Sequence, residues 1–149
     1  MQTHQHWMQK ALELAQKAEE QGEVPVGAVL VKDNEIIGQG FNQPISTHDP
    51  SAHAEIIALR QAAKQIKNYR LVDTTMYVTL EPCAMCAMAM VHARVKTLIY
   101  AASEPRTGAD GSLYQLLQHQ GHNHQIEVIS GIMQEESSEL LKAFFKQRR

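Results

Sequence analysis

The chain has 149 residues, of which 44% are hydrophobic and 20% charged, and its Lys, Arg, Asp and Glu residues give a formal net charge of −2. This length suits one globular domain over residues 1–149. The slightly negative net charge gives no overall attraction to nucleic acid, so nucleic-acid binding would require a local positive patch. No apolar run approaches the ~18 residues of a membrane span, and residues 1–6 lack the features of a secretory signal, so we expect a cytoplasmic protein.

The N-terminal half predicts a helix, a hairpin and a second helix. Apolar residues at helical spacing indicate a helix over residues 7–21 that ends near Gly22. An apolar, β-branched run at 26–31 is followed by a turn-forming sequence at 33–35 and by the start of a return strand at 35–38, which predicts a hairpin. Residues 40–51 are rich in Asn, Pro, Ser and Asp, which is typical of a loop. A helix is then predicted from residue 52 or 53 to about residue 66.

The C-terminal half alternates strands with helices. Strands are predicted at 75–80, 95–101 and 125–129, and helices at 82–92, 113–119 and 135–146, with Pro82 opening the first of these helices. Each of the last three strands is joined to the next through a helix, so we expect these strands to be mutually parallel, with right-handed crossovers. The pattern predicts an α/β fold, in which helices cover both faces of a sheet.

Cys83 and Cys86 are the only cysteines, which excludes a disulfide scaffold. Their i, i+3 spacing at a predicted helix start puts both sulfurs on one face, where free backbone N–H groups and the helix dipole favour thiolates. With His53 they offer three ligands, one fewer than Zn²⁺ prefers, and this number is typical of a catalytic site that keeps a position for water. The residues therefore predict one zinc ion per chain.

Glu55 follows His53 by two residues, about 200° further round an ideal helix. We therefore expect Glu55 to point into the metal pocket from another side, without binding the metal. A carboxylate there can take a proton from zinc-activated water and deliver it to a ring nitrogen or a leaving amine. A redox-active pair is an alternative for the two cysteines taken alone, but His53 and Glu55 favour a zinc deaminase.

The motifs His53-Ala54-Glu55 and Pro82-Cys83-x-x-Cys86 resemble the signature of zinc nucleoside and nucleotide deaminases. Further stretches resemble bacterial tRNA-specific adenosine deaminases, and the resemblance runs from about Trp7 to Arg149. The stretches that carry it are residues 23–29, 40–42, 48–55, 77–83 and 107–108, together with the last six residues, which are similar to that family's anticodon-arm helix.

This resemblance implies a cytidine-deaminase-like fold, a three-layer α/β/α arrangement with a five-stranded mixed sheet. It implies hydrolytic deamination of adenosine to inosine at the wobble position of an arginine tRNA, by a homodimer. Matched by position, it assigns zinc binding to His53, Cys83 and Cys86, and proton transfer to Glu55. It also implies that Asn42 contacts the target nucleoside, Ala54 offers a backbone N–H near the reacting centre, and Val26 lines the base pocket.

The C-terminal helix, residues 135–149, is the predicted RNA-contacting element. Lys142, Lys146, Arg148 and Arg149 put four positive charges into the last eight residues, with no acid among them. Phe144 and Phe145 add possible stacking surfaces. A solvated basic helix end is the alternative explanation of these charges, and the resemblance favours RNA.

The loop around Glu104 and Arg106 is a second predicted RNA contact. Relatives commonly carry Asp at the position of Glu104, so this loop departs from the family pattern.

Two other functions are compatible with the same candidate site residues. One is a small-molecule deaminase that acts on guanine, cytosine or a nucleotide, and the other is a zinc-stabilised RNA-binding module without catalysis, which leaves Glu55 unexplained.

Overall fold

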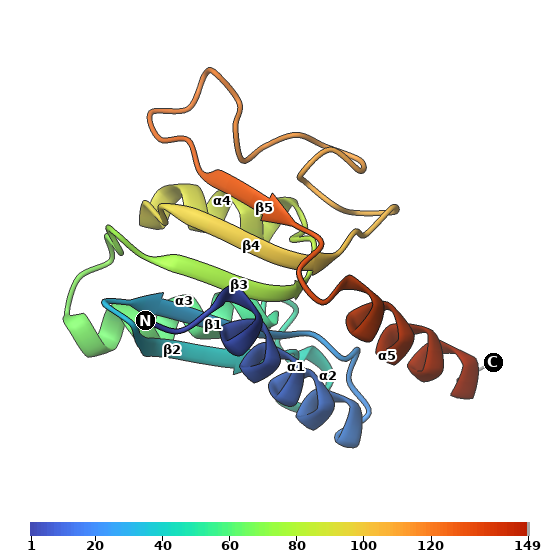
Figure 1. Ribbon diagram of the computed structural model, residues 1–149. Helices are drawn as coiled ribbons and strands as arrows, with labels where there is room; N and C mark the ends of the chain where they lie inside the picture. The colour runs from blue at the N-terminus through green and yellow to red at the C-terminus, as the bar shows by residue number, and fades with distance from the viewer. Residues whose placement is uncertain (149) are drawn as a thin grey trace.

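The computed structural model describes residues 1–148, so the predicted RNA contact Arg149 lies outside the described residues. Five strands form one sheet in the order β2-β1-β3-β4-β5 (Figure 1). β1 pairs antiparallel with β2 and β3, whereas the β3–β4 and β4–β5 pairs are parallel. The mixed five-stranded sheet and the three parallel strands are thus confirmed. The strands are β1 Gly27–Lys32, β2 Glu35–Phe41, β3 Thr75–Leu80, β4 Thr97–Ala102 and β5 Glu127–Ser130.

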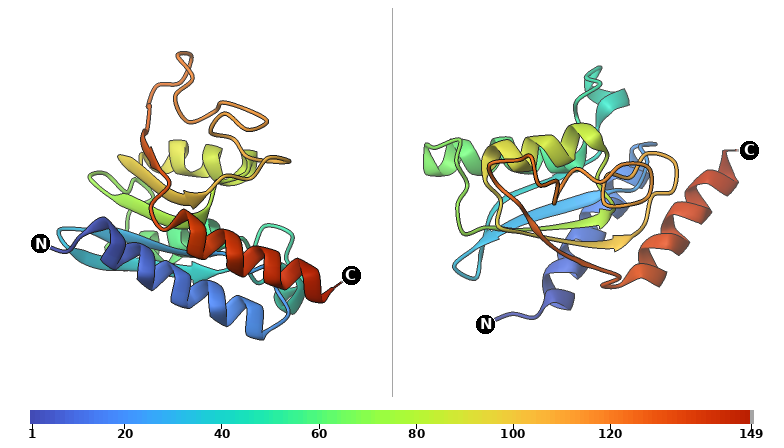
Figure 2. Two further views of the ribbon diagram at one scale, coloured as in Figure 1. Left: turned by 45° about the vertical axis from the view of Figure 1, so that its right-hand side comes forward. Right: turned by 90° about the horizontal axis from the view of Figure 1, so that it is seen from above.

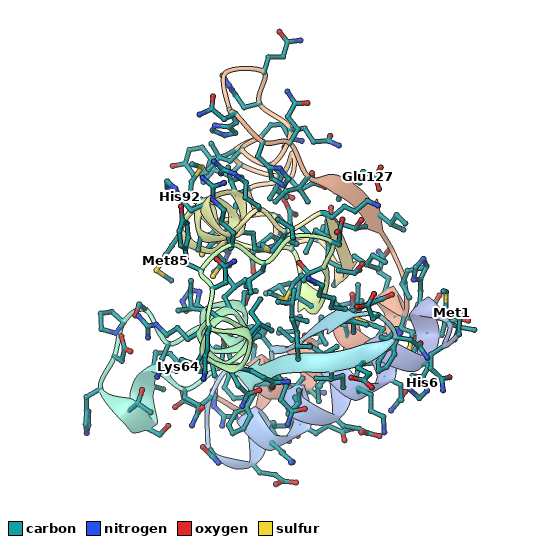
Figure 3. All side chains as sticks on the ribbon, turned by 90° about the vertical axis from the view of Figure 1, so that its left-hand side faces the viewer. Met1, His6, Lys64, Met85, His92 and Glu127 are labelled. Carbon is teal, nitrogen blue, oxygen red and sulfur yellow. The ribbon has the colours of Figure 1, made fainter. Side chains whose placement is uncertain are left out.

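Helices cover both faces of the sheet, as expected. α1 (His4–Glu20) and α5 (Gln134–Gln147) lie on one face, and α3 (Ala54–Ile66) and α4 (Ala84–Ala93) lie on the other (Figure 2). In Figure 3 the labelled Lys64, Met85 and His92 mark the α3–α4 side, opposite His6 of α1. None of the helices within residues 1–148 is both long and apolar enough to cross a bilayer.

The core has two layers because successive side chains of a strand point to opposite faces of the sheet. Val29, Tyr77 and Ile99 pack with α1 in one cluster. Their neighbours Leu30 and Met76 pack under α3 and α4 in the other cluster. Apolar residues therefore run continuously along β1, β3 and β4, as in strands that are buried on both faces.

Both helices that carry the candidate ligands begin later than predicted. α3 begins at Ala54 and α4 at Ala84, so His53 and Cys83 are N-cap residues in extended conformation. Pro82 therefore precedes its helix and does not open it. An N-cap side chain turns back over the first helical turn, which is how Cys83 meets Cys86 although only Cys86 is helical.

Two connections differ from prediction. The expected loop 40–51 contains a short helix, α2 (Pro44–Thr47). The predicted helix over 113–119 is wrong, because the N–H groups of Leu113 and Tyr114 both bond to the carbonyl of Gly108 and fold the chain back on itself. Within this stretch of the described chain only Leu117 is buried, so there is no apolar stripe for a helix to cover.

Candidate active site

The structure brings together the three predicted metal ligands at the adjacent N-termini of α3 and α4. The Nδ1 atom of His53 lies 3.5 Å from the Sγ of Cys83 and 3.5 Å from the Sγ of Cys86. The three potential ligand atoms all lie within 4.8 Å of one another. The two N-terminal helix dipoles also converge here, which favours anionic sulfur.

These distances fit zinc. Zn–S bonds of about 2.3 Å and a Zn–N bond of about 2.0–2.1 Å, at tetrahedral angles, separate nitrogen and sulfur by about 3.5–3.6 Å. Two soft sulfurs and one imidazole are also the donor set that zinc accepts readily. The site is therefore close enough in geometry, and suited in chemistry, to hold this ion with one position left open.

Hydrogen bonding within the cluster sets its protonation. The bond from the Cys86 thiol lowers the pKa of Cys83 to about 4, and His53 adds to this effect. The pKa of Cys86 is raised, chiefly by its bond to Cys83 and then by burial. The bond to Cys83 raises the pKa of His53. The cluster thus already holds a thiolate at neutral pH, at Cys83.

Glu55 lies beside the cluster on the first turn of α3, with only 4% of its surface exposed. Burial raises the pKa of its carboxyl group to about 7. A group that titrates near neutral pH can both accept and donate a proton there. Its carboxylate is not among the ligand atoms that cluster with His53, in line with a separate role.

A cavity of about 210 Å³ gives access to these groups. Apolar side chains form one wall, and polar side chains from four separate segments form the rest. The cavity is lined by Val24, Val26, Asn42, His53, Glu55, Leu80, Glu81, Cys83, Glu104 and Thr107. Of the predicted site residues, the structure places Val26, Asn42, Glu55, His53, Cys83 and Glu104 on this cavity, whereas Cys86 is buried.

Asn42 and Ala54, which were predicted to face the substrate separately, are hydrogen-bonded to each other. The backbone N–H of Ala54 donates to Oδ1 of Asn42 over 2.9 Å. Because an N–H group requires an acceptor, this bond fixes the orientation of the Asn42 amide. Its NH₂ group is then the end left to bind a partner, so Asn42 offers a donor in the cavity.

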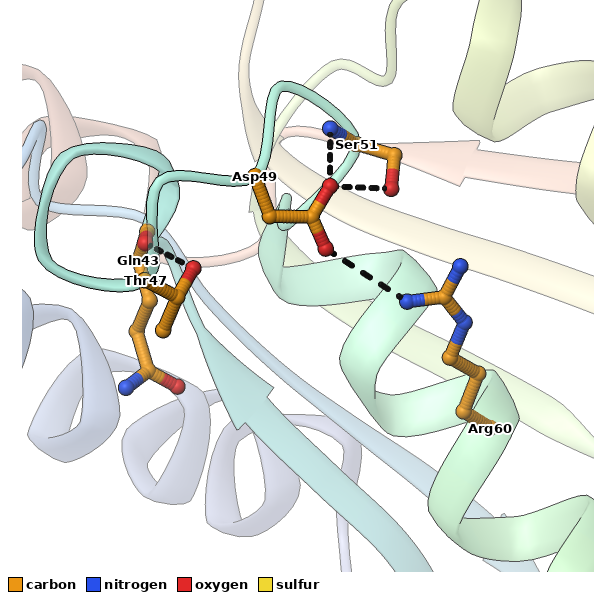
Figure 4. A network of polar contacts seen from close by, with 5 residues as sticks. All are labelled: Gln43, Thr47, Asp49, Ser51 and Arg60. Carbon is orange, nitrogen blue, oxygen red and sulfur yellow. Dashed lines mark hydrogen bonds and ion pairs between the residues drawn. The ribbon is translucent and has the colours of Figure 1, made fainter.

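The segment between Asn42 and His53 is held by its own polar contacts (Figure 4). The hydroxyl of Thr47 donates to the Gln43 carbonyl over 2.6 Å. Asp49 accepts from the backbone N–H and the hydroxyl of Ser51, and lies 3.7 Å from Arg60 of α3. These bonds stabilise the path by which the chain returns from Asn42 to the metal ligand.

A groove of about 770 Å³ adjoins this cavity along α5. It is lined by Glu104, Arg106, Leu141, Lys142, Phe145, Lys146 and Arg148. Glu104 lines both the cavity and the groove, so the two hollows lie next to each other. Four of the seven lining residues are cationic, which gives this surface a positive charge that the whole chain lacks.

Phe144 does not contribute to this surface. It is only 3% exposed, and the Arg148 guanidinium lies 3.6 Å from its ring centroid. The prediction of a stacking surface at Phe144 is therefore wrong, because the side chain serves as an inward anchor of α5. Phe145 is 48% exposed and lines the groove, so it is the one of the pair that a base can reach.

Glu81 and Thr107 line the cavity but were not predicted as functional residues. Glu81 is 2% exposed, and it follows a strand buried on both faces. A charged residue at the inner end of such a strand is unusual unless it has partners. The position of Glu81 at the end of a buried strand was the one signal in the sequence that could have marked it, because its hydrogen-bond partners are distant in sequence.

Comparisons with known proteins find deaminases. A family model described as MafB19-like deaminase matches residues 2–149. A tRNA-specific adenosine deaminase of Haemophilus influenzae is 56% identical over 143 residues, covering 95% of this chain and 83% of that protein.

Solved structures show the same fold. A chain from a study of A-to-I editing by tRNA:A34 deaminases at the wobble position is 41% identical, with a TM-score of 0.88 over 91% of this chain and 99% of that one. A guanine deaminase from Nitrosomonas europaea is 21% identical, with a TM-score of 0.82 over 97% of this chain and 85% of that one. The second likeness concerns the fold alone.

Proposed function

Because this chain belongs to the family of bacterial tRNA-specific adenosine deaminases, we propose that it hydrolyses adenosine to inosine and ammonia at the wobble position of a tRNA anticodon. The tRNA is the arginine tRNA that the resemblance implies. One observation carries the proposal. The buried Glu55 carboxyl lies beside the His53–Cys83–Cys86 cluster on a cavity that adjoins a cationic groove.

His53, Cys83 and Cys86 hold the metal in this proposal, one zinc ion per subunit. When bound, zinc supplies a Lewis acid that lets water lose a proton near neutral pH. Glu55 would receive that proton and deliver it to a ring nitrogen, and would then carry the remaining proton of the added hydroxyl group to the departing amine. The water oxygen bonds to the carbon that carries the amine, the carbon–nitrogen bond breaks, and ammonia leaves.

Residues of the cavity wall bind the base. Val26 and Leu80 supply apolar contacts, and the Asn42 NH₂ group donates to an acceptor of the nucleoside. The backbone bond to Ala54 holds Asn42 in that orientation. A base can enter such a cavity only after it has left its stack, so the substrate is a splayed nucleotide of an anticodon loop.

The groove along α5 binds the RNA backbone next to that nucleotide. Arg106, Lys142 and Lys146 line it and can neutralise phosphates. Phe145 offers an exposed ring for base stacking. Glu104 lines both the cavity and the groove and places an acid among these cations. In this proposal it contacts the nucleotide nearest the cavity.

A cytoplasmic homodimer is part of the proposal. It follows from the family resemblance, and an apolar surface on the α3–α4 side supports it. There a hollow of about 340 Å³ is lined mainly by apolar side chains, among them Ile56, Leu59 and Ala89, with Tyr69 largely exposed beside them. Ile56 and Leu59 themselves are buried, so the exposed Tyr69 ring at the edge of this apolar hollow is the part that a second copy could cover.

The test is incubation of the zinc-loaded protein with total bacterial tRNA, followed by mapping of adenosine-to-inosine changes. We expect inosine at the wobble position of arginine tRNA and at no position inside a stem. A stem–loop with adenosine at the wobble position should react, and the same sequence locked in a duplex should not. Turnover of free guanine or cytosine at rates that match the stem–loop would contradict the proposal and favour a small-molecule deaminase.

A further inference from the structure

Glu81 is a buried carboxylate that the proposed chemistry does not use. It accepts hydrogen bonds from the backbone N–H groups of Glu104 over 3.0 Å, Asp110 over 2.8 Å and Ser112 over 3.4 Å. The Ser112 hydroxyl donates a fourth bond. No cation of the described chain forms an ion pair with Glu81. The charge of this carboxylate is therefore stabilised by one loop alone, residues 103–112.

The loop that Glu81 holds forms the wall shared by the cavity and the groove. Glu104 and Thr107 line the cavity, and Glu104 and Arg106 line the groove. Backbone contacts tie the loop to the metal-ligand turn as well, since the Ala109 N–H donates to the Pro82 carbonyl and Gly108 forms a bridge with Cys83. Glu81 thus lies between the turn that carries Cys83 and the wall that the substrate meets.

Gly108 shows how closely the loop fits over this carboxylate. A Cβ atom added at Gly108 would collide with the carboxyl carbon and both carboxylate oxygens of Glu81. The glycine is therefore required for close approach, because the space of its missing side chain is filled by the carboxylate. This explains why a glycine follows Thr107 at the rim of the cavity.

We propose that Glu81 is a positioning residue, whose carboxylate holds loop 103–112 in the shape that grips the substrate. Loop order and substrate affinity then depend on Glu81, whereas the metal site and the proton transfer do not. The effect of Glu81 on substrate affinity rests on the proposed function, whereas its effect on the order of the loop is independent of that function.

The first test is amide hydrogen exchange in Glu81→Gln. A glutamine keeps the size but has one acceptor oxygen, which can serve Asp110 and Ser112, while its NH₂ group turns to the Ser112 hydroxyl. The Glu104 N–H then loses its acceptor, and we expect its exchange to accelerate on the order of tenfold, with a smaller change at Asp110. The exposed Glu13→Gln on α1 is the matched control. Exchange at Glu104 equal to that of the unaltered protein would overturn the proposal.

The second test separates positioning from chemistry. In Glu81→Gln we expect the KM for a wobble-adenosine stem–loop to rise roughly tenfold, with kcat changed less than about twofold and zinc content unchanged. Loss of zinc, or a fall in kcat alone, would overturn the proposal. If Glu81→Gln does not fold, Ser112→Ala removes one donor and should show the same pattern more weakly. If the unaltered protein does not deaminate the RNA, the proposed function fails, and the exchange experiment still decides the role of Glu81.

The third test uses Gly108. Gly108→Ala should release the loop as Glu81→Gln does, because the methyl group displaces the carboxylate. In a Glu81→Ala background the space next to Gly108 is no longer filled by the carboxylate. Adding Gly108→Ala there should accelerate amide exchange at Glu104 by less than about twofold. If Gly108→Ala accelerates amide exchange equally in both backgrounds, the glycine is needed only for the backbone conformation. That result would contradict the anchoring of the loop by Glu81.

Discussion

The carboxyl group of Glu55 combines burial with a position next to the metal-ligand cluster. Its pKa is raised to about 7, so both protonation states are available near neutral pH. Glu55→Gln keeps the size and the hydrogen bonding but cannot carry a proton. We expect the single-turnover rate of deamination to fall by ~10²–10⁴-fold or more, since general acid–base catalysis is worth about that much.

Zinc content and RNA affinity should stay near normal in Glu55→Gln, because the side chain is not a ligand. Metal analysis and RNA binding on the same preparation check this. Near-normal single-turnover rates with zinc bound would contradict the proton-transfer role and the mechanism proposed above.

The protonation of the ligand cluster predicts how zinc affinity changes with pH. Cys83 has a lowered pKa, which favours its thiolate, whereas Cys86 and His53 have raised pKa values, which favour their protonated forms in the metal-free protein. Zinc binds the deprotonated ligands, so any proton that they carry must leave on binding. Affinity should therefore rise as pH increases from about 6 to 8, with protons released on binding. Calorimetry in buffers of different ionisation enthalpy measures this release, and binding without it would contradict the ligand set.

Helix α5 presents its two faces to different partners. Phe144 and Ser137 are buried, and the Ser137 hydroxyl donates to the Thr79 carbonyl over 2.5 Å. Lys142 and Lys146 line the groove. A double variant, Lys142→Ala with Lys146→Ala, should therefore weaken RNA binding and leave thermal stability almost unchanged.

The salt dependence of binding checks whether these lysines contact phosphates. Each lost contact with single-stranded RNA should reduce the slope of log affinity against log salt by about 0.7. The matched control is Lys10→Ala with Lys64→Ala, which removes the same charge from α1 and α3. An unchanged slope in the α5 variant would show that these lysines do not contact phosphates and only form a solvated helix end.

The success of sequence prediction differs between elements for physical reasons. β3 lies at the predicted residues 75–80 because its apolar run is bounded by polar residues. The 113–119 segment failed because its apolar spacing resembles a helix although Leu113 is exposed. Helix α2 has only four residues, too few for periodicity to detect.

The same contrast holds within the site. The ligand set was predictable because sulfur and imidazole at a fixed spacing have few other uses. Glu81 was not, because its partner Ser112 is 31 residues away. The bond between Asn42 and Ala54 likewise depends on the packing of β2 against α3, which spacing alone does not determine.

In the molecule as a whole, a metal held by the predicted ligands would join α3 and α4. His53 caps α3 and Cys83 caps α4, so zinc bound there crosslinks the two helices of one layer in the folded state only. A ligand present at about 1,000 times its Kd stabilises the fold by about 4 kcal/mol. For a domain of this size, each kcal/mol shifts Tm by about 2–4 °C.

We therefore expect a strong chelator to lower Tm by roughly 8–16 °C, with recovery when zinc is restored. Differential scanning calorimetry measures the shift. Cys83→Ser should unfold at the lower temperature whether or not chelator is present, because its site no longer holds the metal in the native state. Since the apolar layers on both faces of the sheet remain, the metal-free chain should still unfold cooperatively. A Tm that does not respond to chelator in the unaltered protein, when metal analysis shows that zinc has been removed, would contradict the crosslinking role.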